Sequence, residues 1–135
     1  MNEFETTEEL TAIELSLPAN AAYVSAVRQT ASSIASRLNF DVDELEDVRS
    51  LVSEVCGLLI KKSGGHGGFL IKFDPSDGKK IKISFTLSHA EKVDIEKDDM
   101  GLAMIQALAD KFDIVPAKNG NLLLSIEKVH KELLL

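Results

Sequence analysis

The sequence has 135 residues, of which 44% are hydrophobic, and both values suit a single domain with a sizeable core. The formal net charge of −7 argues against binding to nucleic acid or to an anionic membrane surface, because phosphates would be repelled. The single cysteine, Cys56, cannot form an internal disulfide, which favours a reducing, cytoplasmic compartment.

The first stretch, MNEFETTEEL, is acidic and has no apolar centre, so it does not read as a signal peptide. No apolar run reaches the roughly 20 residues that a membrane-spanning helix needs. Residues 1–11 are predicted to be a flexible acidic N-terminus, and residues 12–135 are predicted to form one domain. The three histidines are not spaced as zinc ligands would be, and no metal site is expected.

The first half of the domain is predicted to contain one strand and two helices. Apolar and polar residues alternate over 12–18, which indicates a strand. Asn20 is a candidate N-cap for a helix that runs to about residue 38. Asp41, followed three residues later by Glu44, resembles a capping box, and the helix that it opens should end before the glycines of SGGHGG.

The second half is predicted to contain four strands and one helix. Two strand-like runs are joined by DPSDGK, in which Gly78 stands where a positive φ is needed. The spacing of apolar residues from Met100 to Phe112 predicts the third helix, with Met100 and Met104 in the core. Asn119–Gly120 is a strong signal for a final hairpin. The four predicted strands are 69–73, 80–87, 112–116 and 121–129.

This order of elements, β-α-α-β-β-α-β-β, predicts an α+β two-layer sandwich. Helices should pack on one face of a mostly antiparallel sheet. No internal repeat and no linker between domains is evident in the sequence.

Within the second predicted helix, LVSEVCGLLIKK (51–62), one carboxylate stands in an apolar run. Helical geometry places Glu54 at the edge of the apolar face, between Leu51 and Leu58. A catalytic base, the vestige of one, and an ordinary solvent-facing residue are all compatible with that position.

Two blocks of sequence point to a family. They are YVSAVRQTASSIASRLNFDVDELEDVRSLVSEVC (23–56) and MGLAMIQALADKFDIV (100–115). In this order, and joined by two predicted strands, they resemble the anti-sigma-factor serine kinases of the GHKL (histidine-kinase-like, Bergerat-fold) ATPases. The resemblance extends over about residues 12–129 and implies the Bergerat fold, protein partners and a homodimer. Arg28 matches an arginine of the first helix that these anti-sigma factors use to contact their partners; a solvent-facing helix residue is the alternative.

The resemblance also implies a nucleotide site, but most of its polar positions are replaced. The family motif S-E-x-C-x-N supplies a catalytic glutamate, matched by Glu54, and a magnesium ligand, which is Leu58 here. Leucine has no oxygen to offer Mg²⁺. The adenine-binding D-x-G motif reads LSH, with Leu87 and His89 in place of the aspartate and the glycine.

Two further motifs of the family are altered in this chain. The glycine-rich box reads DDMGL and keeps Gly101, but two aspartates now stand where phosphate would lie. The threonine of the last hairpin is Leu122. Each lost hydrogen bond to a charged ligand is worth about 1.5–3 kcal/mol, so together the losses predict absent or very weak ATP binding, with Glu54 as a vestigial base.

Three functions are therefore considered. The first is a regulatory module without cofactor, which binds a sigma factor, an anti-anti-sigma protein or a paralogous kinase. The second is an active serine/threonine kinase using Mg-ATP, which Glu54 and Gly101 support. The third is a domain that binds a ligand less charged than ATP in the altered pocket.

Overall fold

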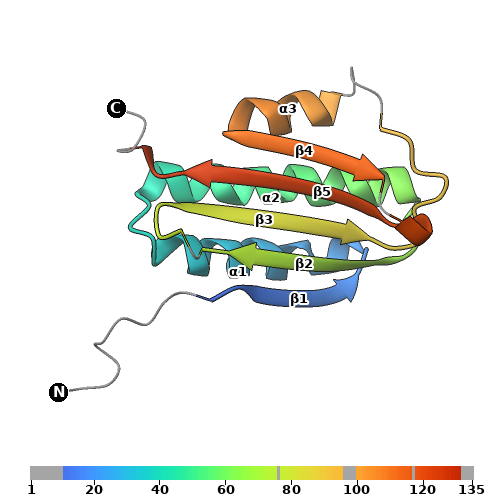
Figure 1. Ribbon diagram of the computed structural model, residues 1–135, viewed down its shortest axis with the longest axis horizontal. Coiled ribbons are helices and arrows are strands. Elements are labelled where there is room, and N and C mark those ends of the chain that lie inside the picture. Colours follow the sequence, from blue (N-terminus) through green and yellow to red (C-terminus); the bar gives the residue numbers. More distant parts are fainter. Residues whose placement is uncertain (1–10, 76, 96–99, 117, 132–135) are drawn as a thin grey trace.

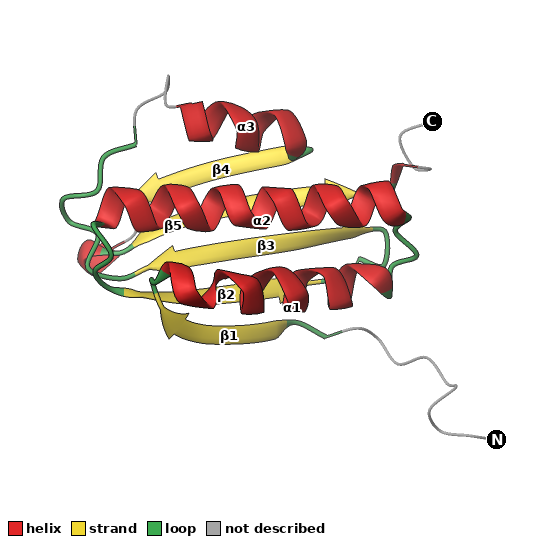
Figure 2. Ribbon diagram, turned by 180° about the vertical axis from the view of Figure 1, so that it is seen from behind, coloured by secondary structure: helices red, strands yellow, loops and turns green. Residues whose placement is uncertain are grey.

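The computed structural model describes residues 11–75, 77–95, 100–116 and 118–131. Two layers make up the molecule, with the helices packed on one face of a five-stranded sheet (Figures 1 and 2). The strands are β1 (Ile13–Pro18), β2 (Gly68–Asp74), β3 (Lys80–Leu87), β4 (Lys111–Pro116) and β5 (Leu122–Val129). The helices are α1 (Val24–Ser36), α2 (Val42–Ser63) and α3 (Met100–Leu108), with short 3-10 turns at Ala21–Tyr23 and Lys118–Gly120.

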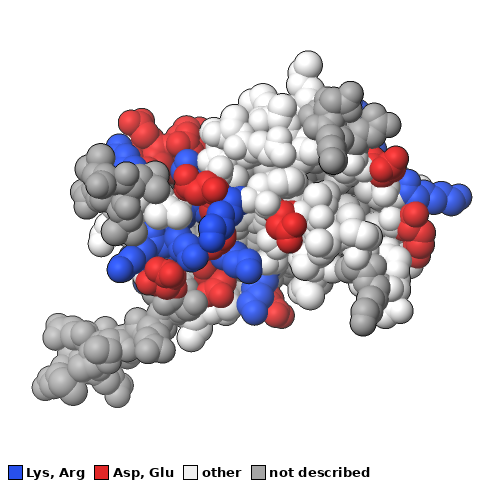
Figure 3. Space-filling model, turned by 45° about the horizontal axis from the view of Figure 1, so that its top comes forward, with Lys and Arg blue, Asp and Glu red and all other residues white. Residues whose placement is uncertain are grey.

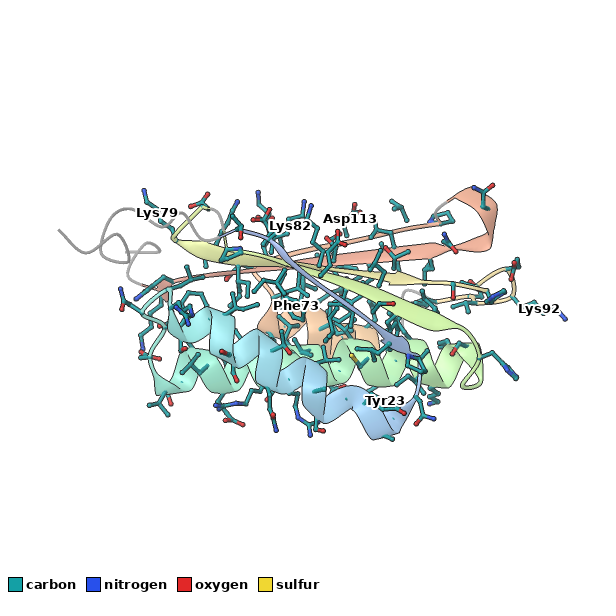
Figure 4. All side chains as sticks on the ribbon, turned by 90° about the horizontal axis from the view of Figure 1, so that it is seen from below. Tyr23, Phe73, Lys79, Lys82, Lys92 and Asp113 are labelled. Atoms are coloured by element: carbon teal, nitrogen blue, oxygen red, sulfur yellow. The ribbon has the colours of Figure 1, made fainter. Side chains whose placement is uncertain are left out.

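The sheet has the strand order β1-β2-β3-β5-β4, and all four of its pairings are antiparallel. This confirms the predicted α+β sandwich. Side chains alternate between the two faces, so that Phe73 points into the core while Lys82 and Asp113 lie on the opposite face (Figure 4). In the helical layer, α2 lies between α1 and α3 (Figure 2).

The helix boundaries follow from local chemistry. The Asp41 side chain accepts a hydrogen bond from the Glu44 backbone N–H, and the Glu44 side chain accepts one from the Asp41 N–H, so the predicted capping box is confirmed. Gly64 ends α2 with φ of 68°, a conformation that glycine adopts without strain. Asn20 caps the short 3-10 turn Ala21–Tyr23, since its side chain accepts a hydrogen bond from the Ala22 N–H. It was predicted to cap the helix itself, but α1 begins at Val24 with Tyr23 at its N-cap and ends at Ser36.

Both predicted turns are present. Gly78 has φ of 77° between β2 and β3. Asn119 and Gly120 have φ of 63° and 76° between β4 and β5, which is the conformation that an Asn-Gly pair favours.

The third helix differs from its prediction in two respects. It ends at Leu108, and Phe112 lies on β4. Met100 and Met104 were expected in the core, but they are 82% and 48% exposed. Only Leu102 and Ile105 of this helix are buried. Residue 11 lies outside regular structure, and the rest of the predicted N-terminal segment, like Asp98 and Asp99, lies outside the described residues.

Candidate functional site

Glu54 lies on α2 at a groove between α2 and α3 with a volume of about 330 Å³. Its side chain is half-buried, as its predicted position at the helix edge requires. The same groove is also lined by Leu58, one turn further along α2, and by Gly101 near the start of α3. We call it the α2–α3 groove, and its lining residues are Glu54, Gly57, Leu58, Lys61, Met100, Gly101 and Met104.

The structure thus brings together three of the residues that the sequence singled out, Glu54, Leu58 and Gly101. Leu58 is only 5% exposed and belongs to the hydrophobic core. An alkyl side chain at this place offers no ligand to a hard cation. Within the described residues, no group of three or more His, Cys, Asp or Glu side chains is arranged to hold a metal ion.

Leu87 and Leu122 lie elsewhere, on the inner face of the sheet. They are directly opposite each other on β3 and β5 and are 0% and 9% exposed. Both side chains are part of the hydrophobic core. These two positions therefore contribute packing, and neither offers a polar group.

His89 follows β3 with φ of 55°, in the left-handed region that glycine adopts most easily. It lies at a second hollow, of about 390 Å³, together with His66. The two histidines come from separate loops, and no sequence pattern indicates that they would meet. The hollow is lined by Lys62, Ser63, His66, His89, Glu91, Lys92 and Val93.

Arg28 lies on the other side of α2, where α1 packs against it. Its guanidinium Nη1 donates a hydrogen bond to the Ser53 hydroxyl at 3.2 Å, and that hydroxyl donates to the Arg49 carbonyl at 2.9 Å. Arg28 is half-buried, so part of its side chain faces solvent and part packs between the two helices. This contact joins α1 to α2 and holds one edge of the guanidinium in place.

Cys56 is fully buried on α2, as a small apolar residue would be. Burial raises the pKa of its thiol to about 12, against the opposing effect of the Arg28 charge. A thiol with so high a pKa is a poor nucleophile near neutral pH, which leaves Cys56 with a structural role.

The α2–α3 groove also contains Lys61, Met100 and Met104, which were not predicted to be site residues. The position of Lys61 could have been inferred, because it stands seven residues after Glu54 and so projects from the same side of α2. The two methionines gave no such signal, since their spacing fits a buried face equally well.

Comparison with known proteins gives partial matches in sequence and a broad match in fold. No protein-family model matches the chain. The serine-protein kinase RsbW of Halalkalibacterium halodurans is 38% identical over 56 residues, which are 42% of this chain and 35% of that protein. RsbW of Bacillus subtilis is 30% identical over 92 residues, or 66% of this chain and 58% of that protein.

The crystal structure of the RsbU and RsbW domains of Rv1364c from Mycobacterium tuberculosis superposes with a TM-score of 0.69. The match covers 89% of this chain and 32% of the other, at 14% identity, so it shows a shared fold alone. In the sequence matches, the chain spans between about a third and 58% of the length of the RsbW proteins.

Proposed function

From the homology of this chain to the RsbW serine-protein kinases and its GHKL-type fold, we propose a regulatory protein-binding module that acts by partner switching. Its partner is a sigma factor, an anti-anti-sigma protein or a paralogous kinase, and it works as a homodimer in the cytoplasm. Nucleotide binding is lost or very weak, and no cofactor is used. Among the described residues, no helix is long and apolar enough to cross a membrane.

One observation carries the proposal: the positions matched to polar nucleotide contacts are occupied by buried apolar side chains. Leu58, Leu87 and Leu122 are 5%, 0% and 9% exposed. Because all three belong to the core, a nucleotide would have to displace packed side chains and would gain no hydrogen bond from them. Protein binding, in contrast, needs only the outer surface of the helices.

Calorimetric titration with Mg-ATP and Mg-ADP tests the loss of nucleotide binding. We expect no heat of binding and no thermal stabilisation at millimolar nucleotide. Binding at micromolar concentration would contradict the proposal. A Leu58→Asn variant provides a comparison, and we expect that it does not restore binding, because Leu87 and Leu122 remain buried.

The partner surface is proposed to include Arg28 on α1. Arg28→Glu should weaken binding to candidate sigma factors and anti-anti-sigma proteins by at least tenfold if this side chain is central to the interface. Arg37→Glu is a matched control, because it makes the same charge change at an exposed position at the end of the same helix. If both variants bind the partners as tightly as the wild type does, and both unfold at the wild-type temperature, the first helix is excluded as the partner surface.

An ATP-dependent serine/threonine kinase is the second candidate function. It is supported by the half-buried Glu54, which shares the α2–α3 groove with Gly101. Transfer of phosphate from ATP to a candidate partner, abolished in Glu54→Ala, would establish this activity in place of the first proposal.

A further inference from the structure

Helix α3 carries an exposed apolar stripe. Its nine residues include no charged side chain and one polar side chain, Gln106. A helix that is apolar all round is usually buried, yet this one buries two residues. The exposed apolar residues recur at positions i, i+3, i+4 and i+7, which places them on one side of the helix. We call Met100, Ala103, Met104 and Ala107 the α3 stripe.

The described residues of α3 accordingly add no charge to the surface of the molecule. In Figure 3 much of the upper middle of the molecule is white, whereas most of the Lys, Arg, Asp and Glu lie toward the end of the sheet where β3 begins and β5 ends, with a smaller group at the opposite end. Met100 and Met104 contribute most of the apolar exposure on α3, at 82% and 48%. Methionine side chains are flexible and polarizable, and they adapt to the shape of a binding partner.

Met100 and Met104 of the α3 stripe, together with Gly101, form one wall of the α2–α3 groove, and an edge of α2 forms the other. On α2 the groove residues are again spaced i, i+3, i+4 and i+7, from Glu54 to Lys61. Gly57 leaves the floor open, since a Cβ added there would meet no atom within 4 Å. Leu58 supplies a buried apolar surface at the base.

The two charged residues of the groove have opposite signs and lie at opposite ends of its α2 wall. Glu54 and Lys61 are seven residues apart, which is about 10 Å along a helix axis. Neither side chain forms an ion pair or hydrogen bond within the part of the chain that the structure describes. The groove is therefore apolar along its length, acidic at one end and basic at the other.

We propose that the α2–α3 groove binds one amphipathic helix of a protein partner. The apolar face of that helix packs on Leu58, Met100 and Met104. A basic residue of the helix pairs with Glu54, and an acidic residue about two turns away pairs with Lys61. This inference rests on the proposed protein-binding function and assigns it a second surface, on the opposite side of α2 from Arg28.

Three fluorescently labelled helical peptides test the proposal in anisotropy titrations. All three peptides have leucines at positions i, i+3, i+4 and i+7, and they differ only at two flanking sites that are two helical turns apart. The first peptide has Lys at one site and Glu at the other, the second has Lys at both, and the third has Glu at both. The wild-type protein should bind the Lys/Glu peptide about two- to fivefold more tightly than either of the others, as expected for two solvated ion pairs. In Lys61→Glu the preference should pass to the two-Lys peptide, and in Glu54→Lys to the two-Glu peptide.

The apolar contact is tested on the same peptides with Met104→Glu and Gln106→Glu. Both variants add one carboxylate to an exposed position of α3, but only the first changes the α3 stripe. Met104→Glu should weaken binding at least tenfold, and Gln106→Glu should leave it within twofold. Thermal unfolding of each variant shows whether the fold is intact.

Two outcomes would overturn the proposal. In the first, no peptide binds; in the second, the affinity depends neither on the peptide charges nor on Met104→Glu. Self-association of the protein that Met104→Glu abolishes would assign the groove to a second copy of the chain. In each of these cases a loss of partner binding in Arg28→Glu would still support the proposed function, so the two ideas fail separately.

Discussion

Leu87 on β3 lies directly opposite Leu122 on β5, and the two side chains are buried in the same core. The family resemblance matches both positions to polar residues that contact nucleotide. In this chain the pair instead continues the inner row of apolar residues along the two strands, after Phe85 opposite Leu124. The two leucines thus form an apolar contact across the strands.

Truncating one of these two leucines should destabilise the fold. We expect Leu87→Ala to lower the free energy of unfolding by about 2–5 kcal/mol, because it deletes buried methyl groups and leaves a cavity. Urea titration followed by circular dichroism measures the change. Leu70→Ala is the control, since Leu70 lies on the uncovered face of the sheet and is 44% exposed. Equal losses in the two variants would mean that Leu87 has no special role in packing.

Much of the fold could be predicted because local signals agree with the tertiary structure. The capping box of Asp41 and Glu44 sets the start of α2, and the Asn119–Gly120 turn sets the last hairpin. The phase of α3 could not be predicted in the same way. When nearly every residue of a helix is apolar, the periodic pattern no longer distinguishes the side that faces the core from the side that faces solvent.

The candidate site was predictable to a smaller extent. Glu54 and Leu58 stand four residues apart on one helix, so helical geometry alone places them together. Gly101 joins them only because α3 packs against α2, a tertiary contact that the sequence suggests through the family resemblance. His89 lies at a different hollow, with His66, because the conformation of the loops decides where each ring lies.

Glu44 is a buried carboxylate, 4% exposed, that accepts hydrogen bonds from its own helix start and from the segment after β5. Its Oε1 accepts from the Asp41 N–H at 2.9 Å, and its Oε2 accepts from the Lys131 N–H at 2.6 Å. Glu44→Ala should cost about 1–3 kcal/mol, measured by urea unfolding, because two part-buried hydrogen bonds to the carboxylate are lost. Glu46→Ala, which removes an exposed pairing with Arg49, should cost less than about 0.5 kcal/mol. Similar losses in both variants would argue against this role of Glu44.

The ion pair between Lys80 and Glu127 predicts how stability depends on pH. The Lys80 ammonium, 2.7 Å from the Glu127 carboxylate, lowers the pKa of Glu127 below its ordinary value of 4.5, although partial burial opposes the effect. The same pairing raises the pKa of Lys80 above 10.5. Because the folded Glu127 binds its proton less tightly, its contribution is complete above pH 4.5 and is lost as the pH falls through the lowered pKa. The Lys80 contribution is complete below pH 10.5 and is lost as the pH rises through the raised pKa.

The measurement is the difference in unfolding free energy between wild type and Glu127→Gln over a range of pH. The difference should be constant near neutrality and should shrink below about pH 4.5. Glu46→Gln is a control at an exposed helix position, and its difference from wild type should change little over the same range. A Glu127→Gln difference that grew in acid would contradict the assignment.

Cys56 should be unreactive in the folded protein and reactive in the unfolded one. Burial raises the pKa of its thiol from 9.0 to about 12, so the reactive thiolate is scarce near neutral pH. The side chain is also fully inaccessible, so reaction with a disulfide reagent such as DTNB requires opening of the helical layer. We expect the labelling rate at pH 8 to be negligible in buffer and to rise with urea in parallel with the unfolded fraction. Leu87→Ala should be labelled faster than wild type, because the destabilised variant populates open states more often. Rapid labelling of the native wild-type protein would contradict the prediction and would show that the α1–α2 interface opens without unfolding of the core.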